Sequence, residues 1–328
     1  MGLEDLRLFA LDDTRAFGEA VGRALGIALA QHEERRFEDG EHKARPLESV
    51  RSKDVFVIQS LHGEPGRSVN DKLVTLLFFV ACLKDAAAGR VTAVIPYLVY
   101  ARKDRKTQTR DPVTTRYVAA LLEAVGADRV LALDVHNPAA FQNAFRCGTD
   151  HLEARPLFAR HAARLVGAEE VAVVSPDTGG AKRAEALRAS LARLLARPVA
   201  NAFAEKYRAR GEVTGELLVG DVSGRVALIV DDLISTGGTI VRAARACREA
   251  GAKSVYALAT HGLFVGGAQE LFAEPSVAEI VVTNSVPPPP LDRAGAGAKL
   301  VVLDVAPFFA EAIGRIHAGG SLVELLEP

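Results

Sequence analysis

Cysteine is scarce in this chain, which has only Cys82, Cys147 and Cys247 among its 328 residues. Three widely spaced cysteines favour neither a disulfide framework nor a four-thiolate metal site, and a reducing compartment fits them best. The chain also has almost no net charge, because 40 basic and 41 acidic side chains give a formal charge of −1. Without a global cationic field, we expect no nucleic-acid partner, and any anion binding must be local.

Long apolar runs are absent as well. No stretch approaches the roughly 18 apolar residues that a membrane span needs, and the amino terminus has no basic segment followed by an apolar one. We therefore expect a cytoplasmic protein with no membrane partner. The residues that are present, 49% hydrophobic and 25% charged, are typical of a soluble globular protein, and the length predicts two domains.

Short apolar runs alternate with segments of helical period along the whole chain, which predicts an α/β fold with mainly parallel sheets flanked by helices. Both halves contain an apolar strand followed by acidic residues, Asp134 in one and Asp231-Asp232 in the other, so we expect two similar domains, 1–152 and 153–328. Residues 147–150 indicate a turn near this boundary, and 306–317 a final helix. The expected strands are 6–11, 55–59, 91–96, 130–133, 171–175, 226–230, 255–259 and 280–282.

The strongest chemical signal is the segment 227–239, where the apolar strand is followed by Asp231 and Asp232 and then by a turn of small residues into a helix. Glycines let the backbone approach an oxyanion, and the free N–H groups of a helix start favour negative charge. The carboxylates can accept hydrogen bonds from sugar hydroxyls. A phosphorylated ribose satisfies both demands. The turn residues are Ser235, Thr236, Gly237, Gly238 and Thr239.

A second signal is the basic segment 102–106, which holds four cations in five residues and follows the apolar run 91–96. Ligands of open parallel sheets bind beyond the carboxyl ends of the strands. The position therefore favours a polyphosphate site, although a solvated charge run is the usual alternative.

Several segments together resemble the ribose-phosphate diphosphokinase family within the phosphoribosyltransferase-like superfamily. The likeness extends from about Phe37 to His317 in the order of the family. It implies two phosphoribosyltransferase-like domains, the first for ATP and the second for ribose 5-phosphate, with the last helix packing back on the first. The matching segments are 36–41, 95–106, 131–136, 174–180, 231–239 and 281–285.

The resemblance assigns the ATP-binding residues in the first half. Phe37, Asp39 and Glu41 match an adenine-binding hairpin that reaches into a neighbouring subunit, which implies a homo-oligomer and in most relatives a homohexamer. Arg102 matches an arginine that contacts ATP, and Lys103 and Asp104 follow it. The family usually has glutamine at position 103, so the adenine contacts stay open there.

The remaining assignments concern metal binding and catalysis. The resemblance implies that His136 and Asp177 help to hold Mg²⁺ with ATP, and that Asp231–Thr239 bind ribose 5-phosphate. It also implies a mobile loop at 205–211 whose Lys206 and Arg208 are catalytic and close over the transferring group. We expect these cations to stabilise charge on the diphosphate in the transition state.

The reaction implied by the resemblance moves the β,γ-diphosphate of Mg-ATP to the anomeric hydroxyl of ribose 5-phosphate and gives phosphoribosyl diphosphate and AMP. No glycine-rich Walker pattern is present, so a P-loop kinase is not expected. Two alternatives remain: a phosphoribosyltransferase that consumes phosphoribosyl diphosphate, and a catalytically silent regulatory homologue of the synthetase.

Overall fold

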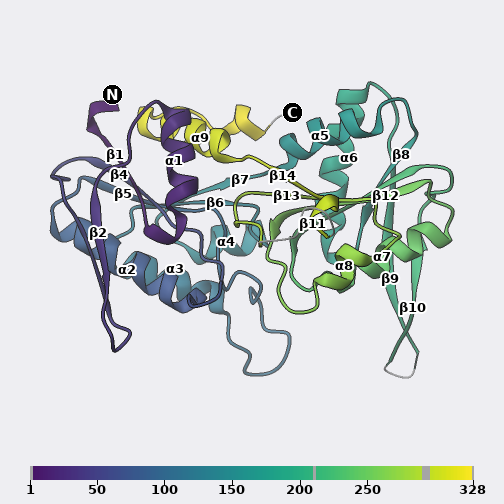
Figure 1. The fold of residues 1–328 in the computed structure, drawn as a ribbon, viewed down its shortest axis with the longest axis horizontal. Coiled ribbons are helices and arrows are strands. Elements are labelled where there is room, and N and C mark those ends of the chain that lie inside the picture. Colours follow the sequence, from purple (N-terminus) through teal and green to yellow (C-terminus); the bar gives the residue numbers. More distant parts are fainter. Residues whose placement is uncertain (1–2, 210–211, 290–295, 327–328) are drawn as a thin grey trace. The chain divides into compact units, whose positions relative to one another are not determined.

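The computed structural model describes residues 3–209, 212–289 and 296–326, without the side chains of 205–217 and 296–297. The chain divides into two compact units (Figure 1). Unit 1 comprises Met1–Leu152 and Val305–Leu325, and unit 2 comprises Glu153–Asp304 and Leu326–Pro328. Within the described parts, no helix combines the length and the apolar character needed to cross a membrane.

Unit 1 is built on a five-stranded sheet of order β1-β4-β5-β6-β7, in which every neighbouring pair is parallel. All five residues of the second strand in this order, 54–58, are buried, as expected for a parallel sheet with both faces covered. A separate antiparallel hairpin joins two further strands. The strands are β1 (Leu6–Ala10), β2 (His32–Arg36), β3 (His42–Pro46), β4 (Asp54–Ile58), β5 (Arg90–Ile95), β6 (Arg129–Leu133) and β7 (Gly148–Leu152).

Helices cover both faces of this sheet, with α1 and α9 on one side and α2 and α3 on the other (Figure 1). Phe17 of α1 packs edge-to-face on Phe309 of α9, with ring centroids 5.5 Å apart, so the C-terminal helix contributes to the core of unit 1. The helices are α1 (Arg15–Leu25), α2 (Val69–Asp85), α3 (Thr114–Ala124), α4 (Pro138–Ala144) and α9 (Ala306–Ala318), with 3-10 turns η1 (Leu3–Asp5), η2 (Asp12–Thr14) and η5 (Val323–Leu326).

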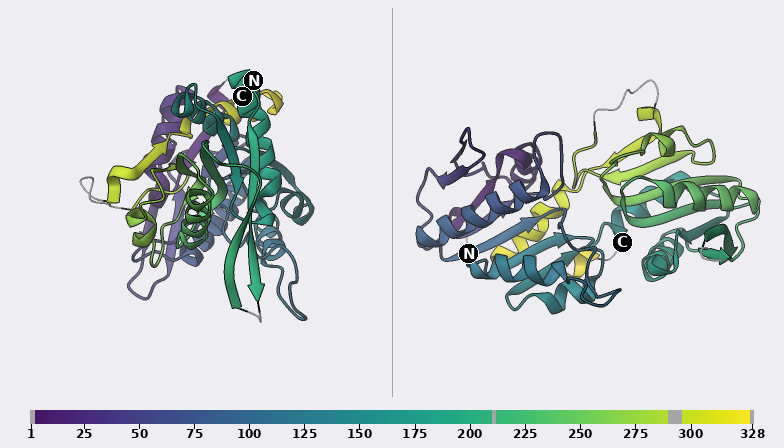
Figure 2. Two further views of the ribbon diagram at one scale, coloured as in Figure 1. Left: turned by 90° about the vertical axis from the view of Figure 1, so that its right-hand side faces the viewer. Right: turned by 90° about the horizontal axis from the view of Figure 1, so that it is seen from below.

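Unit 2 contains a seven-stranded sheet of order β10-β9-β8-β11-β12-β13-β14, parallel except for the antiparallel pair β9 and β10. Helices α5 and α6 cover one face, and α7 and α8 the other (Figures 1 and 2). The strands are β8 (Val171–Ser175), β9 (Ala200–Ala209), β10 (Glu212–Val219), β11 (Val226–Ile234), β12 (Ser254–Gly262), β13 (Glu279–Thr283) and β14 (Leu300–Leu303). The helices are α5 (Arg155–Val166), α6 (Ala181–Leu195), α7 (Gly238–Glu249) and α8 (Gln269–Ala273), with η3 (Thr178–Gly180) and η4 (Ala296–Lys299).

All eight strands expected from the sequence are present, but three local predictions are wrong. Residues 148–150, expected as a turn, begin the edge strand β7, which hydrogen-bonds to β6 along one side only and so tolerates a polar sequence. Residues 205–209, expected as a loop, continue β9 because pairing with β10 satisfies their backbone groups. The strand expected to end at Val230 runs on to Ile234.

Candidate active site

The acidic pair lies at the carboxyl edge of the sheet of unit 2. Strand β11 pairs with β8 only as far as Ile229, opposite Val174, whereas its pairing with β12 continues to Ile234. Asp231 and Asp232 therefore stand on a strand that extends past its shorter neighbour. This is the edge at which ligands of parallel α/β sheets bind.

The two carboxylates are close to a cation that the sequence did not single out. The Nη1 atom of Arg183 lies 3.4 Å from an Oδ1 atom of both Asp231 and Asp232. The side chain of Asp232 is 5% exposed and that of Asp231 is 22% exposed. Burial, followed by the charge of Asp232, raises the pKa of Asp231 well above its ordinary value. A ligand that brings hydroxyl donors would relieve this unfavourable burial of charge.

The turn after β11 requires glycine at position 237. Gly237 has a φ of +83°, and a Cβ atom on it would stand 2.7 Å from Cβ of Leu271, so a side chain would be both strained and sterically blocked. Helix α7 begins at the next residue, Gly238. The turn therefore links the end of β11, which carries the acidic pair, to the start of α7 with its unsatisfied N–H groups. Such a start favours a phosphate.

Asp177 follows the adjacent strand β8 and already has a structural role. Its Oδ1 atom accepts hydrogen bonds from the N–H groups of Gly179 at 2.9 Å and Gly180 at 3.1 Å, and so caps η3. Its Oδ2 atom makes no hydrogen bond to another described residue. One carboxylate oxygen is therefore available for a ligand, and the expected role of Asp177 at a metal remains a prediction.

In unit 1, the basic segment 102–106 lies on the connection between β5 and α3, and its cations fall into two groups. Lys103 is held within the connection, because its Nζ lies 2.5 Å from Oδ2 of Asp111 and also donates to the hydroxyl of Thr107. This contact, the Thr107 hydroxyl and two backbone N–H groups lower the pKa of Asp111. Arg102, by contrast, is exposed and forms no ion pair with another described residue. The segment is thus not a uniform cluster of four free cations.

The connection also contacts the segment that carries His136. Asn137 donates from Nδ2 to Oδ2 of Asp104 at 2.6 Å, and its own Oδ1 accepts from the N–H of Ala140 to cap α4. His136 precedes this asparagine and is exposed. Two of the expected ATP-side segments are therefore brought together within unit 1. His136 and Asp177, the expected pair of metal ligands, belong to different units.

The expected adenine-binding residues lie at the end of the β2–β3 hairpin. The N–H of Phe37 donates to the carbonyl of Glu41 at 2.8 Å, and the N–H of Glu41 donates to Oδ1 of Asp39 at 3.1 Å. The guanidinium of Arg35 lies 4.8 Å from the centroid of the Phe37 ring. The tip is therefore an ordered turn with one aromatic ring and three exposed carboxylates, those of Glu38, Asp39 and Glu41.

The end of β2 next to this tip is fixed by an ion-pair network that the sequence did not reveal. Asp13 accepts from Arg36 at 3.0 Å and from Arg67 at 3.0 Å, and its side chain is almost fully buried. Arg67 also donates to Thr75 of α2 at 3.1 Å. Because these partners are far apart in sequence, spacing alone could not have paired them.

Lys206 and Arg208 are located only by their backbone. They lie on β9 opposite Glu216 and Val213 of β10, and these two strands extend beyond the others of their sheet (Figure 1). Their side chains lie outside the described residues. Their catalytic role remains a prediction.

Comparison with known proteins identifies the family. Residues 6–126 match the N-terminal domain of ribose phosphate pyrophosphokinase, and residues 201–327 match the phosphoribosyl synthetase-associated domain. The chain is 40% identical to a ribose-phosphate pyrophosphokinase of Caldanaerobacter subterraneus subsp. tengcongensis, over 98% of this chain and 97% of that protein. It is also 40% identical to one of Bacillus caldolyticus, over 98% of each.

A solved structure agrees with these relatives. The crystal structure of phosphoribosylpyrophosphate synthetase from Mycobacterium smegmatis superimposes with a TM-score of 0.85 at 35% identity, and covers 96% of this chain and 99% of that one. The predicted fold class, α/β with mainly parallel sheets flanked by helices, is confirmed. The chain thus covers at least 97% of each of these three relatives. The chain belongs to the ribose-phosphate pyrophosphokinase family.

Proposed function

We propose that this chain is a ribose-phosphate diphosphokinase, which transfers the β,γ-diphosphate of ATP to the anomeric hydroxyl of ribose 5-phosphate. The observation that carries the proposal, beside membership of the family, is the connection from Asp231 to Thr239. It joins a buried acidic pair to a helix start across a turn that requires glycine. One end suits sugar hydroxyls, and the other suits a phosphate.

In this proposal, ribose 5-phosphate is oriented by residues of unit 2. Asp231 and Asp232 accept hydrogen bonds from the ribose hydroxyls, while the turn of Ser235, Thr236 and Gly237 and the helix start at Gly238 and Thr239 hold the 5-phosphate. Arg183, which contacts both carboxylates, limits their mutual repulsion until the sugar arrives. Fixing both ends of the sugar directs its anomeric oxygen toward the diphosphate, and this positioning supplies much of the catalysis in phosphoryl transfer.

ATP is assigned to residues of unit 1. Arg102 is the exposed cation best suited to its phosphates, with Lys103 and Asp104 shaping the connection that carries it. Phe37 offers a ring for adenine, and Asp39 and Glu41 offer acceptors for its amino group. Lys206 and Arg208 are the proposed catalytic cations on the transferring diphosphate. The anomeric oxygen forms a bond to the β-phosphorus as the bond from that phosphorus to the oxygen of AMP breaks, and the proton of the anomeric hydroxyl is released to water.

Magnesium is the proposed cofactor. The free Oδ2 of Asp177 and the exposed imidazole of His136 are too few to hold the ion alone, which suits a metal that keeps waters and substrate phosphates in its shell. When bound, magnesium neutralises charge on the β- and γ-phosphates. The protein groups then orient the phosphates and keep water away, and Lys206 and Arg208 add positive charge at the transferring diphosphate.

The proposed assembly is a homohexamer in which the β2–β3 hairpin completes the ATP site of a neighbouring subunit. The proposed compartment is the cytoplasm, a reducing environment that suits three cysteines which form no disulfide. Light scattering after size-exclusion chromatography measures the subunit count. A single-subunit mass would contradict the shared site.

The direct test incubates the purified protein with ATP, magnesium and ribose 5-phosphate. We expect AMP and phosphoribosyl diphosphate in equal amounts, and neither product when ribose 5-phosphate is omitted. A phosphoribosyltransferase would instead consume added phosphoribosyl diphosphate in the presence of a base. A silent homologue would release no product in either assay, and each of these two outcomes would contradict the proposal.

A further inference from the structure

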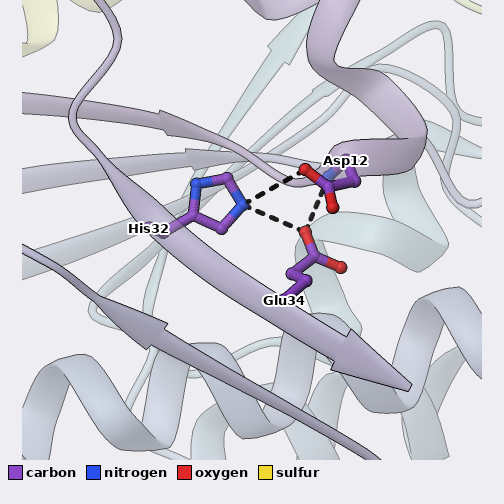
Figure 3. Close-up of side chains that lie close together, drawn as sticks. All are labelled: Asp12, His32 and Glu34. Atoms are coloured by element: carbon purple, nitrogen blue, oxygen red, sulfur yellow. Dashed lines mark hydrogen bonds and ion pairs between the residues drawn. The ribbon is translucent and has the colours of Figure 1, made fainter.

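Three potential metal ligands converge at the base of the β2–β3 hairpin, outside the candidate active site (Figure 3). His32 and Glu34 are two residues apart on β2, so their side chains lie on the same side of the strand. Both point toward Asp12 at the start of η2. The Nε2 atom of His32 lies 3.0 Å from Oε1 of Glu34 and 3.8 Å from Oδ1 of Asp12. All three ligand atoms lie within 4.8 Å of one another.

Two of the three side chains, those of His32 and Glu34, are buried and held in place. The side chains of His32 and Glu34 are 2% and 8% exposed. The imidazole packs near the rings of Phe9 and Phe79, with centroid distances of 6.2 and 5.6 Å. Glu34 is held by the N–H of Asp12, which donates to its Oε1 at 2.6 Å. The side chain of Asp12, at 53% exposure, leaves the group open to solvent on one side.

The two distances from His32 suit one small cation. Two ligand atoms bonded at 2.0–2.2 Å to a tetrahedral ion stand roughly 3.4 Å apart, and the two distances from His32 lie on either side of that figure. An imidazole nitrogen with two carboxylates selects a transition metal, whereas magnesium and calcium prefer oxygen ligands throughout. We propose that Asp12, His32 and Glu34 bind a divalent transition-metal ion, zinc above all, with water at the open position.

An ordinary hydrogen-bonded His–Glu pair is the competing explanation, and the chain contains one for comparison. His161 of unit 2 lies 3.4 Å from Glu279 through the same atom types. Within the described residues, the group of Asp12, His32 and Glu34 is the only one in which three or more histidine, cysteine or acidic side chains come close enough to share an ion. His161 therefore provides a matched control without a third ligand.

A cation at this position would tie β2 to the turn after β1. The next residue, Asp13, already holds Arg36 at the end of β2, so the metal would add a second attachment beside the first. The hairpin continues to Phe37, Asp39 and Glu41. The consequence that the metal steadies an ATP-binding hairpin rests on the proposed function, whereas the binding of metal does not.

The test measures metal content and not activity. The full-length protein is stripped with a chelator, dialysed against micromolar zinc with excess magnesium, and analysed by mass spectrometry for zinc per chain. We expect the wild-type protein and His161→Gln to hold one zinc more per chain than His32→Gln, Glu34→Gln and Asp12→Asn. The dissociation constant should rise at least ~100-fold in Glu34→Gln, because even outer-shell changes weaken metal sites by 10- to 100-fold.

Cobalt provides a second readout in the same proteins, because its visible absorption reports ligands bound to the ion. The band expected for wild-type and His161→Gln should be lost in Glu34→Gln, which keeps the shape of the glutamate. Equal zinc contents and equal cobalt spectra in all variants would overturn the proposal, even if every variant makes product. If His32→Gln does not fold, Glu34→Gln and Asp12→Asn decide the result. Bound zinc in a protein without transferase activity would support the metal site and contradict only the proposed function.

Discussion

His317, near the end of α9, lies with Nδ1 2.6 Å from Oδ2 of Asp54, at the start of β4. Both side chains are buried, and Arg90 of β5 binds the same carboxylate through two nitrogens while donating to the carbonyl of Ile316. The pair joins the C-terminal helix to the sheet of unit 1 across 263 positions of sequence. It therefore explains how a helix far along the chain completes the first core.

The first prediction concerns this pair. His317→Ala should lower the free energy of unfolding by about 1–3 kcal/mol, because Asp54 keeps Arg90 but loses one buried hydrogen-bond partner. Denaturation by urea followed by circular dichroism measures the change. His161→Ala, which removes a partly exposed partner of Glu279, serves as the control and should cost less than about 1 kcal/mol. Equal losses in both variants would contradict the role given to His317.

The second prediction concerns the acidic pair. At a pH above the raised pKa of Asp231, Asp231→Asn and Asp232→Asn should weaken binding of ribose 5-phosphate by ~1.5–3 kcal/mol, since a sugar hydroxyl loses a charged acceptor. The KM for ATP should change little. Steady-state kinetics with each substrate varied in turn measures both effects. Asp221→Asn, in an exposed pair with Arg225, is the control. Equal losses for both substrates would assign the pair to the metal or to the fold.

The third prediction is a pH dependence. Burial and the charge of Asp232 raise the pKa of Asp231, so this carboxyl keeps its proton to a higher pH than an ordinary aspartic acid. The charged form is the stronger acceptor, and kcat/KM for ribose 5-phosphate should therefore rise with pH through the raised pKa. In Asp232→Asn, one cause of the shift is removed, and the midpoint of the rise should move to lower pH. An unchanged midpoint would show that another group titrates.

Protein stability should have the opposite dependence on pH at this site. A carboxyl whose pKa is raised by folding contributes stability that is fully present below its unfolded pKa and is lost as pH rises through its folded pKa. The free energy of unfolding of the wild-type protein should therefore decline more steeply with pH, over the range between these two pKa values, than that of Asp231→Asn. Urea denaturation at several pH values measures both slopes.

The fourth prediction separates the cations of the 102–106 segment. Arg102→Ala should raise the KM for ATP roughly tenfold, as expected for the loss of one charge-assisted hydrogen bond. Lys103→Gln should change it little, because Lys103 is bound to Asp111 and Thr107 within the connection. Arg105→Ala, another exposed position of the same segment, is the matched control. A larger effect from Lys103→Gln than from Arg102→Ala would reverse these roles.

The fifth prediction concerns turnover. Lys206→Ala and Arg208→Ala should lower kcat by at least ~100-fold with modest changes in both KM values, because groups that stabilise the transition state contribute little to ground-state binding. Lys253→Ala, on an exposed ion pair with Glu169, is the control. Near-normal turnover in both variants would remove these cations from the mechanism.

The sequence predicted the buried strands well, because continuous apolar runs such as Val55–Ile58 and Val171–Val174 have few other ways to be buried. It failed for β7 and for the extension of β9, two largely polar segments whose backbones pair with a neighbouring strand. Hydrophobic periodicity carries no signal for such pairing. The resemblance to a family assigned a role to residues 205–211, but it did not predict that β9 and β10 extend into this segment.

The sequence identified the motifs of the candidate site, but it did not predict which residues contact one another there. The connection from Asp231 to Thr239 was recognisable because carboxylates, hydroxyls and glycines coincide within nine residues. Arg183 and Asp111 were missed, since each is one charged residue among many and gains its meaning from a partner brought close by folding. The same holds for Asp12 and His32, which lie on separate elements.

The fate of the anomeric oxygen of ribose 5-phosphate tests the proposed reaction most directly. With ribose 5-phosphate labelled by ¹⁸O at that position, ATP and magnesium, we predict phosphoribosyl diphosphate that keeps the label in the bridge between C1 and the β-phosphorus, formed in equal amount with AMP. ³¹P NMR detects the bridge through the isotope shift of that phosphorus. Loss of the label from the bridge while the remaining ribose 5-phosphate still carries it, or release of ADP in place of AMP, would contradict transfer of a diphosphate to the anomeric hydroxyl.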